Sequence, residues 1–194
     1  AGDQVAVGPG QGRHRARRSD LFFWLLARAA GLASFIALAI AVLSGVALRT
    51  SALDWLATNR AMRELHTYAT ALWLPLGAVH LVTLLFDRTA RVTVADLVVP
   101  FGVSYGPVAV GLGTIAFDLF VLVTVTSWMK RHVEQRTWSW IHRTSYVAFA
   151  LTFAHAVLSG TDFSAPAVSA LAWSIGFAIL VLSAARLAWG RLPS

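Results

Sequence analysis

The chain has 194 residues, of which 57% are hydrophobic and only 13% are charged, and its mean hydropathy is +0.66. Because soluble domains carry about a quarter charged residues, this composition excludes an ordinary soluble protein and predicts one integral membrane domain. The absence of cysteine excludes disulfides, iron–sulfur clusters and zinc thiolate sites, and leaves six histidines as the best nitrogen ligands. The net charge of +7 is expected in loops that face anionic lipid, with no nucleic acid as a partner.

The first part of the chain, residues 1–20, is rich in Gly and Arg, lacks helical periodicity and ends in the basic sequence Arg13 to Asp20. We expect it to be a flexible N-terminal tail unless lipid or a partner holds it. The membrane domain is then expected to cover 21–190. Its first span is predicted at about 21–48, because residues 29–48 are all uncharged and twenty such residues cross the hydrocarbon core.

Four further apolar stretches predict membrane spans at about 62–86, 107–129, 137–160 and 167–189. Residues 92–106 contain several Pro and Gly residues and are predicted to form an interfacial stretch between two of these spans. Gly111 and Gly113, within a span, are expected to serve helix packing. The predicted fold class is therefore all-α, a five-span helical bundle.

Basic residues are divided unevenly between the two sides of this bundle. One side collects Arg49, Arg60, Arg63, Lys130, Arg131, Arg136, Arg143, Arg186 and Arg191. The short loops of the other side carry only Arg88 and Arg91. The positive-inside rule places the larger set in the cytoplasm, so we expect a multi-pass protein of a cell membrane, such as the bacterial plasma membrane. This orientation places the basic N-terminal tail on the outer side of the membrane, whereas the positive charge of the tail would favour the cytoplasmic side.

Two of the predicted spans each contain a pair of histidines. His66 and His80 are fourteen residues apart, which corresponds to a climb of about 21 Å along a helix, and His142 and His155 are thirteen apart. One span intervenes, so the two helices run in the same direction. His66 and His142 lie at charged, inner edges, whereas His80 and His155 each precede an aspartate by seven residues near the outer face. The histidines therefore match at two depths.

These histidines are candidate metal ligands, because a buried ionisable group in a membrane is costly unless it is paired or ligated. Each level offers two histidines and no carboxylate or thiolate. A tetrahedral zinc site would lack two ligands, whereas a porphyrin brings four of its own, so the pattern favours two stacked bis-histidine haems. A fourteen-residue spacing returns to within about 40° of the same helix face, but thirteen leaves about 140°. The helix at 137–160 must therefore distort, or meet the two haems at different angles.

Other residues are weighed as parts of the same site. Trp73 lies seven residues from both His66 and His80, and Phe149 lies seven after His142. Both are expected either between the two haems or in plain core packing. Asp118, in the middle of a span, is expected to be neutral or hydrogen-bonded to a ligand imidazole or to a hydroxyl such as that of Thr114.

Three arginines near the two levels are candidate partners of haem propionates, because a guanidinium matches a carboxylate with two parallel hydrogen bonds. Arg28 lies near the outer level, and Arg63 and Arg143 lie near the inner one. The alternative for all three is contact with lipid headgroups.

Several motifs together resemble the ferric reductase-like transmembrane domain of NADPH oxidases, ferric reductases and the haem-binding membrane subunit of bacterial methionine-sulfoxide reductase systems. They are the His-x13-His and His-x12-His pairs, the run from Trp138 to His142, the segment from Pro100 to Pro107 and GTD at 160–162. The resemblance covers about 25–190. It implies that His66 and His142 bind an inner b-type haem, that His80 and His155 bind an outer one, and that electrons flow from the cytoplasm to the outside.

The function expected from these observations is transmembrane electron transfer by an oxidoreductase-type cytochrome b subunit. No flavin or nicotinamide site is recognisable, so we expect a separate donor, either a reductase or a quinol, and an acceptor at the outer face. A larger membrane complex is a further expected partner. One alternative is a quinol-oxidising enzyme that reduces metal or oxygen itself. Another is a haem-free structural subunit of a larger complex, whose histidines only pack.

Overall fold

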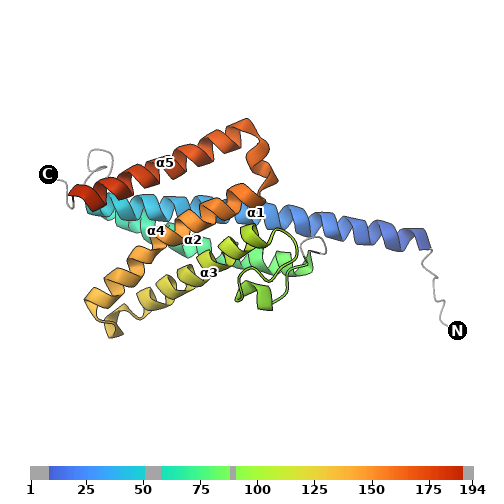
Figure 1. Ribbon diagram of the computed structural model, residues 1–194, viewed down its shortest axis with the longest axis horizontal. Helices are drawn as coiled ribbons and strands as arrows, with labels where there is room; N and C mark the ends of the chain where they lie inside the picture. The colour runs from blue at the N-terminus through green and yellow to red at the C-terminus, as the bar shows by residue number, and fades with distance from the viewer. Residues whose placement is uncertain (1–8, 51–57, 88–90, 190–194) are drawn as a thin grey trace.

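The computed structural model describes residues 9–50, 58–87 and 91–189, and these form helices and connections without any strand. Its five long helices, drawn in Figure 1, are α1 (Pro9–Thr50), α2 (Asn59–Phe86), α3 (Pro107–Trp128), α4 (Gln135–Ser159) and α5 (Pro166–Trp189). Short 3-10 turns lie in the connections: η1 (Ala95–Leu97), η2 (Lys130–His132) and η3 (Thr161–Ser164). The all-α prediction is confirmed, and α2 to α5 begin and end within three residues of the predicted spans.

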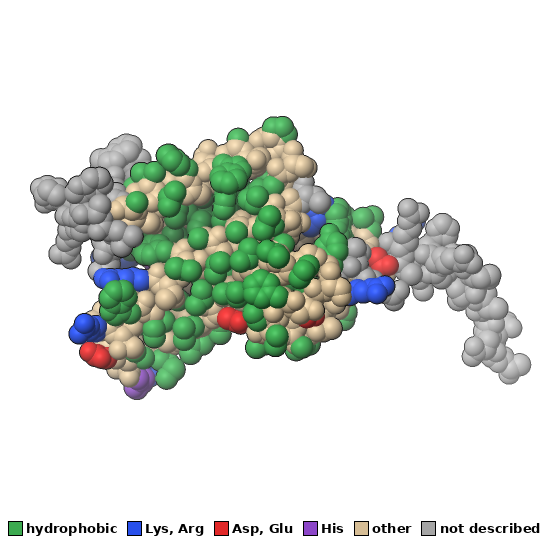
Figure 2. Space-filling model, viewed as in Figure 1, with side chains coloured by type: hydrophobic (Ala, Val, Ile, Leu, Met, Phe, Trp, Pro, Cys, Tyr) green, Lys and Arg blue, Asp and Glu red, His purple; other side chains and the backbone are tan. Residues whose placement is uncertain are grey.

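Four of these helices are long and apolar enough to cross a membrane: α1, α2, α3 and α5. Helix α4 has 25 residues, which is sufficient length, but it carries Arg136, Arg143 and two histidines and is less apolar. Figure 2 shows one face of the molecule covered mainly by hydrophobic side chains, with most charged side chains toward its two ends. The protein is therefore a multi-pass membrane protein that exposes apolar helix surfaces to lipid, and the fifth span stays a prediction.

Helix α1 is longer than the sequence predicted. It begins at Pro9, so residues 9–20 of the expected tail belong to a helix, while residues 1–8 lie outside the described part of the chain. Residues 9–20 contain four Arg, which is a good helix former, and extension of an existing helix needs no new nucleus. The sequence shows no sign of this helix because apolar periodicity indicates burial against a neighbouring element. This end of α1 projects beyond the other helices, so it has no neighbouring helix in the described part of the chain to pack against (Figure 1).

The expected interfacial stretch at 92–106 is built around Asp96. Its carboxylate accepts hydrogen bonds from the hydroxyl and the backbone N–H of Thr93, at 2.7 and 2.8 Å, and its backbone carbonyl accepts one from Thr114 at 2.9 Å. The Thr93 hydroxyl holds the pKa of Asp96 below its ordinary value. Gly106, with φ of +56°, adopts the left-handed conformation that starts α3 before Pro107. The segment is thus an ordered turn that leads from α2 into α3.

The core lies around α1, which packs along α2 and also reaches α4 and α5, while α3 packs along α4. Buried side chains from all five helices form one apolar cluster: Phe35, Ala37, Leu38, Ala39, Val42, Val46, Trp73, Phe120, Ala148, Phe149 and Ile179. The α1–α2 and α3–α4 hairpins are therefore the two main units of packing, and α2 and α4 face each other across the middle of the bundle through their histidines.

Two of the basic residues used to predict the orientation, Arg88 and Arg191, lie outside the described residues. The last residue of the expected membrane domain, residue 190, also lies outside them.

Candidate functional site

The four histidines of α2 and α4 form two pairs, in the combination that the sequence predicted. The ring centroids of His66 and His142 are 6.2 Å apart with an interplanar angle of 70°. Those of His80 and His155 are 6.5 Å apart at 72°. The two pairs therefore have nearly the same geometry at two different depths of the bundle.

This separation matches the span of two imidazoles on opposite sides of one metal ion. A metal–imidazole bond is about 2.0–2.1 Å long and the nitrogen lies about 1.1 Å from the ring centre, so the two centroids are expected about 6.3 Å apart. The observed separations of 6.2 and 6.5 Å lie on either side of this value. The centroid separation of each pair is thus compatible with one metal ion between its rings.

Three of the four imidazoles are held from behind by a backbone carbonyl. The Nδ1 atoms of His66, His80 and His155 lie 2.7, 2.8 and 2.8 Å from carbonyl oxygens of α1 and α3. An Nδ1–H that donates to a carbonyl leaves the lone pair on Nε2, which is the tautomer a metal ligand requires. The arrangement therefore orients each of these rings and makes its Nε2 available.

The acceptors of these bonds were missed by the sequence analysis, although a signal was present. They are Ala41, Ala27 and Ala109, and each is followed four residues later by a glycine, which lies against the same imidazole. Ala-x-x-x-Gly occurs six times in the sequence, and the copies at 27–31, 41–45 and 109–113 are those whose glycine lies against a histidine in the described residues. The two copies on α1 are fourteen residues apart, which is also the spacing of His66 and His80 on α2. Gly113 contacts a candidate ligand as well as serving helix packing.

His142 is held differently from the other three. Its ring stacks on that of Trp138, one helical turn earlier, with centroids 4.9 Å apart and an angle of 21°. The Trp138 indole N–H in turn donates to Ser127 of α3 at 3.4 Å, and the Lys130 ammonium lies 4.1 Å from its ring centre. The Trp138–His142 motif is thus a stacked pair that α3 holds in place.

The thirteen-residue spacing in α4 is accommodated without a break in that helix. Helical hydrogen bonding is continuous from Gln135 to Ser159, so the expected local distortion is not seen. Figure 1 shows α4 running obliquely to α1 and α2. Both His142 and His155 nevertheless lie against histidines of α2.

An aromatic and aliphatic layer lies between the two histidine levels. Trp73 is 6% exposed and Phe149 is 3% exposed, and both belong to the buried cluster. Trp73 packs on Phe120, with centroids 5.3 Å apart, and Phe149 stacks on Phe35 at 5.6 Å. The two residues expected between the levels are therefore buried there as core, each against its own partner.

The arginines near the two levels differ in their contacts. Arg28 forms a bidentate ion pair with Asp162, through Nε at 3.1 Å from Oδ2 and through Nη2 to Oδ1, and lies 4.1 Å from the Trp24 ring centre. Arg143 is exposed and lies 5.0 Å from the Trp140 ring centre. In this structure the fork of Arg28 is thus engaged by a carboxylate of the chain, and the propionate role of both arginines stays a prediction.

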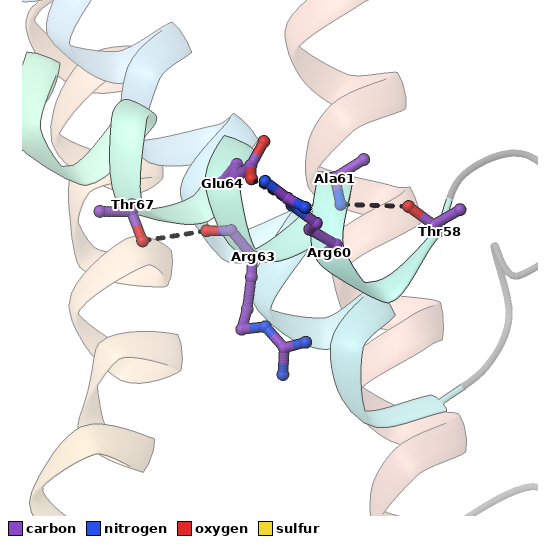
Figure 3. A network of polar contacts seen from close by, with 6 residues as sticks. All are labelled: Thr58, Arg60, Ala61, Arg63, Glu64 and Thr67. Atoms are coloured by element: carbon purple, nitrogen blue, oxygen red, sulfur yellow. Dashed lines mark hydrogen bonds and ion pairs between the residues drawn. The ribbon is translucent and has the colours of Figure 1, made fainter.

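Arg63 is exposed near the start of α2. Figure 3 shows its side chain extending away from the neighbouring ion pair, in which Arg60 Nε lies 2.9 Å from Glu64. Its backbone carbonyl accepts a hydrogen bond from the Thr67 hydroxyl at 2.9 Å. The guanidinium is therefore directed away from the helix's own acidic side chain.

Asp118 does not lie near a ligand. Its side chain is exposed, and the hydroxyl of Thr114, its other expected partner, donates to backbone carbonyls instead. The reason is the register of α3, in which Ala116 and Phe120 are buried. On an ideal helix, position 118 points about 180° away from the midpoint of these two. The expected contact of Asp118 with a ligand imidazole is therefore wrong for this structure.

Within the described residues, no group of three or more His, Asp or Glu side chains is close enough to hold a metal ion. Comparison with protein-family models, with curated proteins and with solved structures gave no match for this chain. The donor set is therefore judged on its own chemistry. Two imidazoles whose ring centroids lie 6.2 or 6.5 Å apart suit a metal centre that brings its other ligands with it, and a haem is such a centre.

Proposed function

We propose that this protein transfers electrons across a membrane through two b-type haems, one between His66 and His142 and one between His80 and His155. The observation that carries the proposal is the separation of the ring centroids, 6.2 and 6.5 Å, at two levels of the same helix pair. A single pair at this distance is compatible with packing alone. Two pairs, three of whose members are fixed at Nδ1 by a carbonyl, favour a common ligand geometry.

The residues of the chain then have separate tasks. The imidazoles of each pair would hold and orient the group, and with two histidines as its protein ligands it would offer a substrate no open coordination site. The layer with Trp73 and Phe149 excludes water between levels that are about 21 Å apart along α2. A bound haem supplies a one-electron redox centre at each level.

The direction and the partners follow from the charge distribution. The larger set of basic loop residues marks the cytoplasmic side, and His66 and His142 lie near it. We therefore place the donor, a reductase or a quinol, on the cytoplasmic side or in the membrane, and the acceptor at the outer face of a bacterial plasma membrane. The resemblance to the ferric reductase-like domain agrees with this direction.

The test begins with the absorption spectrum of the purified protein after expression with ample haem. We expect dithionite-reducible b-type bands and a haem-to-protein ratio near two. His80→Ala and His155→Ala should each remove the outer haem and keep the inner one, and His66→Ala should do the reverse. The matched control is His132→Ala, because His132 is exposed in η2 and belongs to neither pair.

Two results would contradict the proposal. Absence of reducible bands in the wild-type protein would favour a structural subunit whose histidines only pack. Retention of both haems in His80→Ala and His155→Ala would refute the assignment of the ligand pairs.

A further inference from the structure

We infer that three of the six Ala-x-x-x-Gly segments of the sequence position ligand imidazoles, with the glycine providing the space through which the ring reaches the alanine carbonyl. The inference rests on the proposed function. The segments are Ala27–Gly31 and Ala41–Gly45 on α1, and Ala109–Gly113 on α3. They serve His80, His66 and His155 respectively.

The need for glycine follows from the distances that a methyl group would meet. A Cβ on Gly31 would lie 2.8 Å from His80 Nδ1, and one on Gly113 would lie 2.7 Å from His155 Nδ1. Atoms do not approach this closely, so the ring would have to move. A Cβ on Gly45 would lie 3.2 Å from His66 Cε1, which a shift of a few tenths of an ångström relieves. A glycine-to-alanine substitution therefore disturbs the imidazoles of the outer level, at Gly31 and Gly113, more than the imidazole of the inner level, at Gly45.

The atom that a methyl group on Gly31 would displace is His80 Nδ1, which makes the hydrogen bond to the Ala27 carbonyl. Within α1, the carbonyl of Ala27 is already the helical acceptor for the N–H of Gly31, so the imidazole is a second donor to the same oxygen. Such a bond orients the ring and makes its Nε2 more basic, which stabilises the oxidised metal. A methyl group at position 31 pushes the ring away from the carbonyl and so removes both effects.

The two levels differ in this respect. In the outer pair, both imidazoles, those of His80 and His155, contact a glycine of a neighbouring helix. In the inner pair, only the imidazole of His66 makes such a contact. His142 is stacked on Trp138 instead. The glycine segments therefore act twice at the outer level and once at the inner level.

The experiment compares four alanine variants of full-length protein in detergent. Gly31→Ala, Gly113→Ala and Gly45→Ala are the tests, and Gly77→Ala is the control, because a Cβ on Gly77 meets its nearest atom at an ordinary 3.7 Å. Haem content is measured for each variant. A redox titration followed by electron paramagnetic resonance then assigns a midpoint potential to each low-spin haem.

For Gly31→Ala and Gly113→Ala we expect outer-haem affinity to fall by about 10–100-fold, the usual effect of losing a partner of a ligating histidine. The outer haem that remains should have a raised midpoint, with the inner one unchanged. Gly45→Ala should keep both haems and raise only the inner midpoint. A change of yield without a change of midpoint is what a purely structural glycine would give.

Outer content and midpoint equal to those of Gly77→Ala would overturn the inference while leaving the proposed function intact. If the outer variants lose both haems through misfolding, the milder Gly45→Ala decides, and an unchanged inner midpoint then overturns the inference. A wild-type protein without haem overturns the proposed function and this inference together.

Discussion

Replacement of Asp162 by asparagine should loosen the outer end of the bundle, because its carboxylate holds a guanidinium that is 134 residues away in the sequence. Arg28 lies on α1 and Asp162 lies in η3, between α4 and α5. The residue before Arg28 supplies the carbonyl that accepts the His80 imidazole. The ion pair therefore ties the α4–α5 connection to the part of α1 that supports the outer histidine level.

The expected magnitude follows from the exposure of the pair. The side chains of Arg28 and Asp162 are 28% and 37% exposed. Hydrogen bonds to charged groups contribute about 1.5–3 kcal/mol when shielded, and fully exposed ion pairs contribute about 0.2–1 kcal/mol. A bidentate pair that is about one-third exposed should lie between these, at about 1–2 kcal/mol, and should weaken as salt is added.

A double-mutant cycle measures this coupling. Arg28→Gln, Asp162→Asn and the double variant are unfolded in detergent with increasing SDS and followed by the circular dichroism of the helices. We expect each single variant to lose about 1–2 kcal/mol and the double variant to lose little more, because either change already breaks the pair. If the loss of the double variant equals the sum of the two single losses to within about 0.3–0.5 kcal/mol, the two residues are not coupled and the reasoning is refuted.

The same variants separate the two partners considered for Arg28. If the guanidinium binds Asp162, as in this structure, both single variants should have the same effect on the proposed outer haem. If it instead binds a haem propionate, Arg28→Gln should shift the outer midpoint and Asp162→Asn should not.

Three further changes probe the rest of the fold. Phe149→Ala should cost about 3–5 kcal/mol, because the ring is 3% exposed in the core; an equal loss for Phe22→Ala, whose ring is 59% exposed, would contradict this. Thr58→Ala removes the side-chain cap of α2 and should cost about 1 kcal/mol of unfolding free energy, so an unchanged SDS midpoint would refute the capping role. The pKa of Asp96 is lowered by the Thr93 hydroxyl, so the carboxylate stabilises the 92–106 segment above its ordinary pKa of 3.8 and loses this effect as pH falls through the folded value. A carboxyl NMR titration should place Asp96 below 3.8 and move it upward in Thr93→Val, and an unmoved titration would exclude the hydroxyl as the cause.

Much of the helical framework and the histidine pairing follows from one-dimensional patterns. The length of an apolar run sets where a span begins and ends, as the agreement for α2 to α5 shows. Successive spans cross the membrane in opposite directions, so the two histidine-bearing helices run the same way. This direction and the charged residues at the ends of the spans were enough to match His66 with His142 and His80 with His155. These are local properties, because they depend on the helical rise and on the thickness of the hydrocarbon core.

Other features depend on how the helices cross and could not be obtained in this way. The thirteen-residue spacing of His142 and His155 is accommodated within a continuous α4, and Asp118 faces outward because of the way α3 packs. The choice of Ala27, Ala41 and Ala109 as acceptors required the close approach of α1 to α2 and of α3 to α4. The sequence by itself determined which histidines share a depth, since depth is measured along a helix. Only the tertiary structure decided what holds each ring, since the partner of a side chain is set by crossing angles and rotamers that arise from packing.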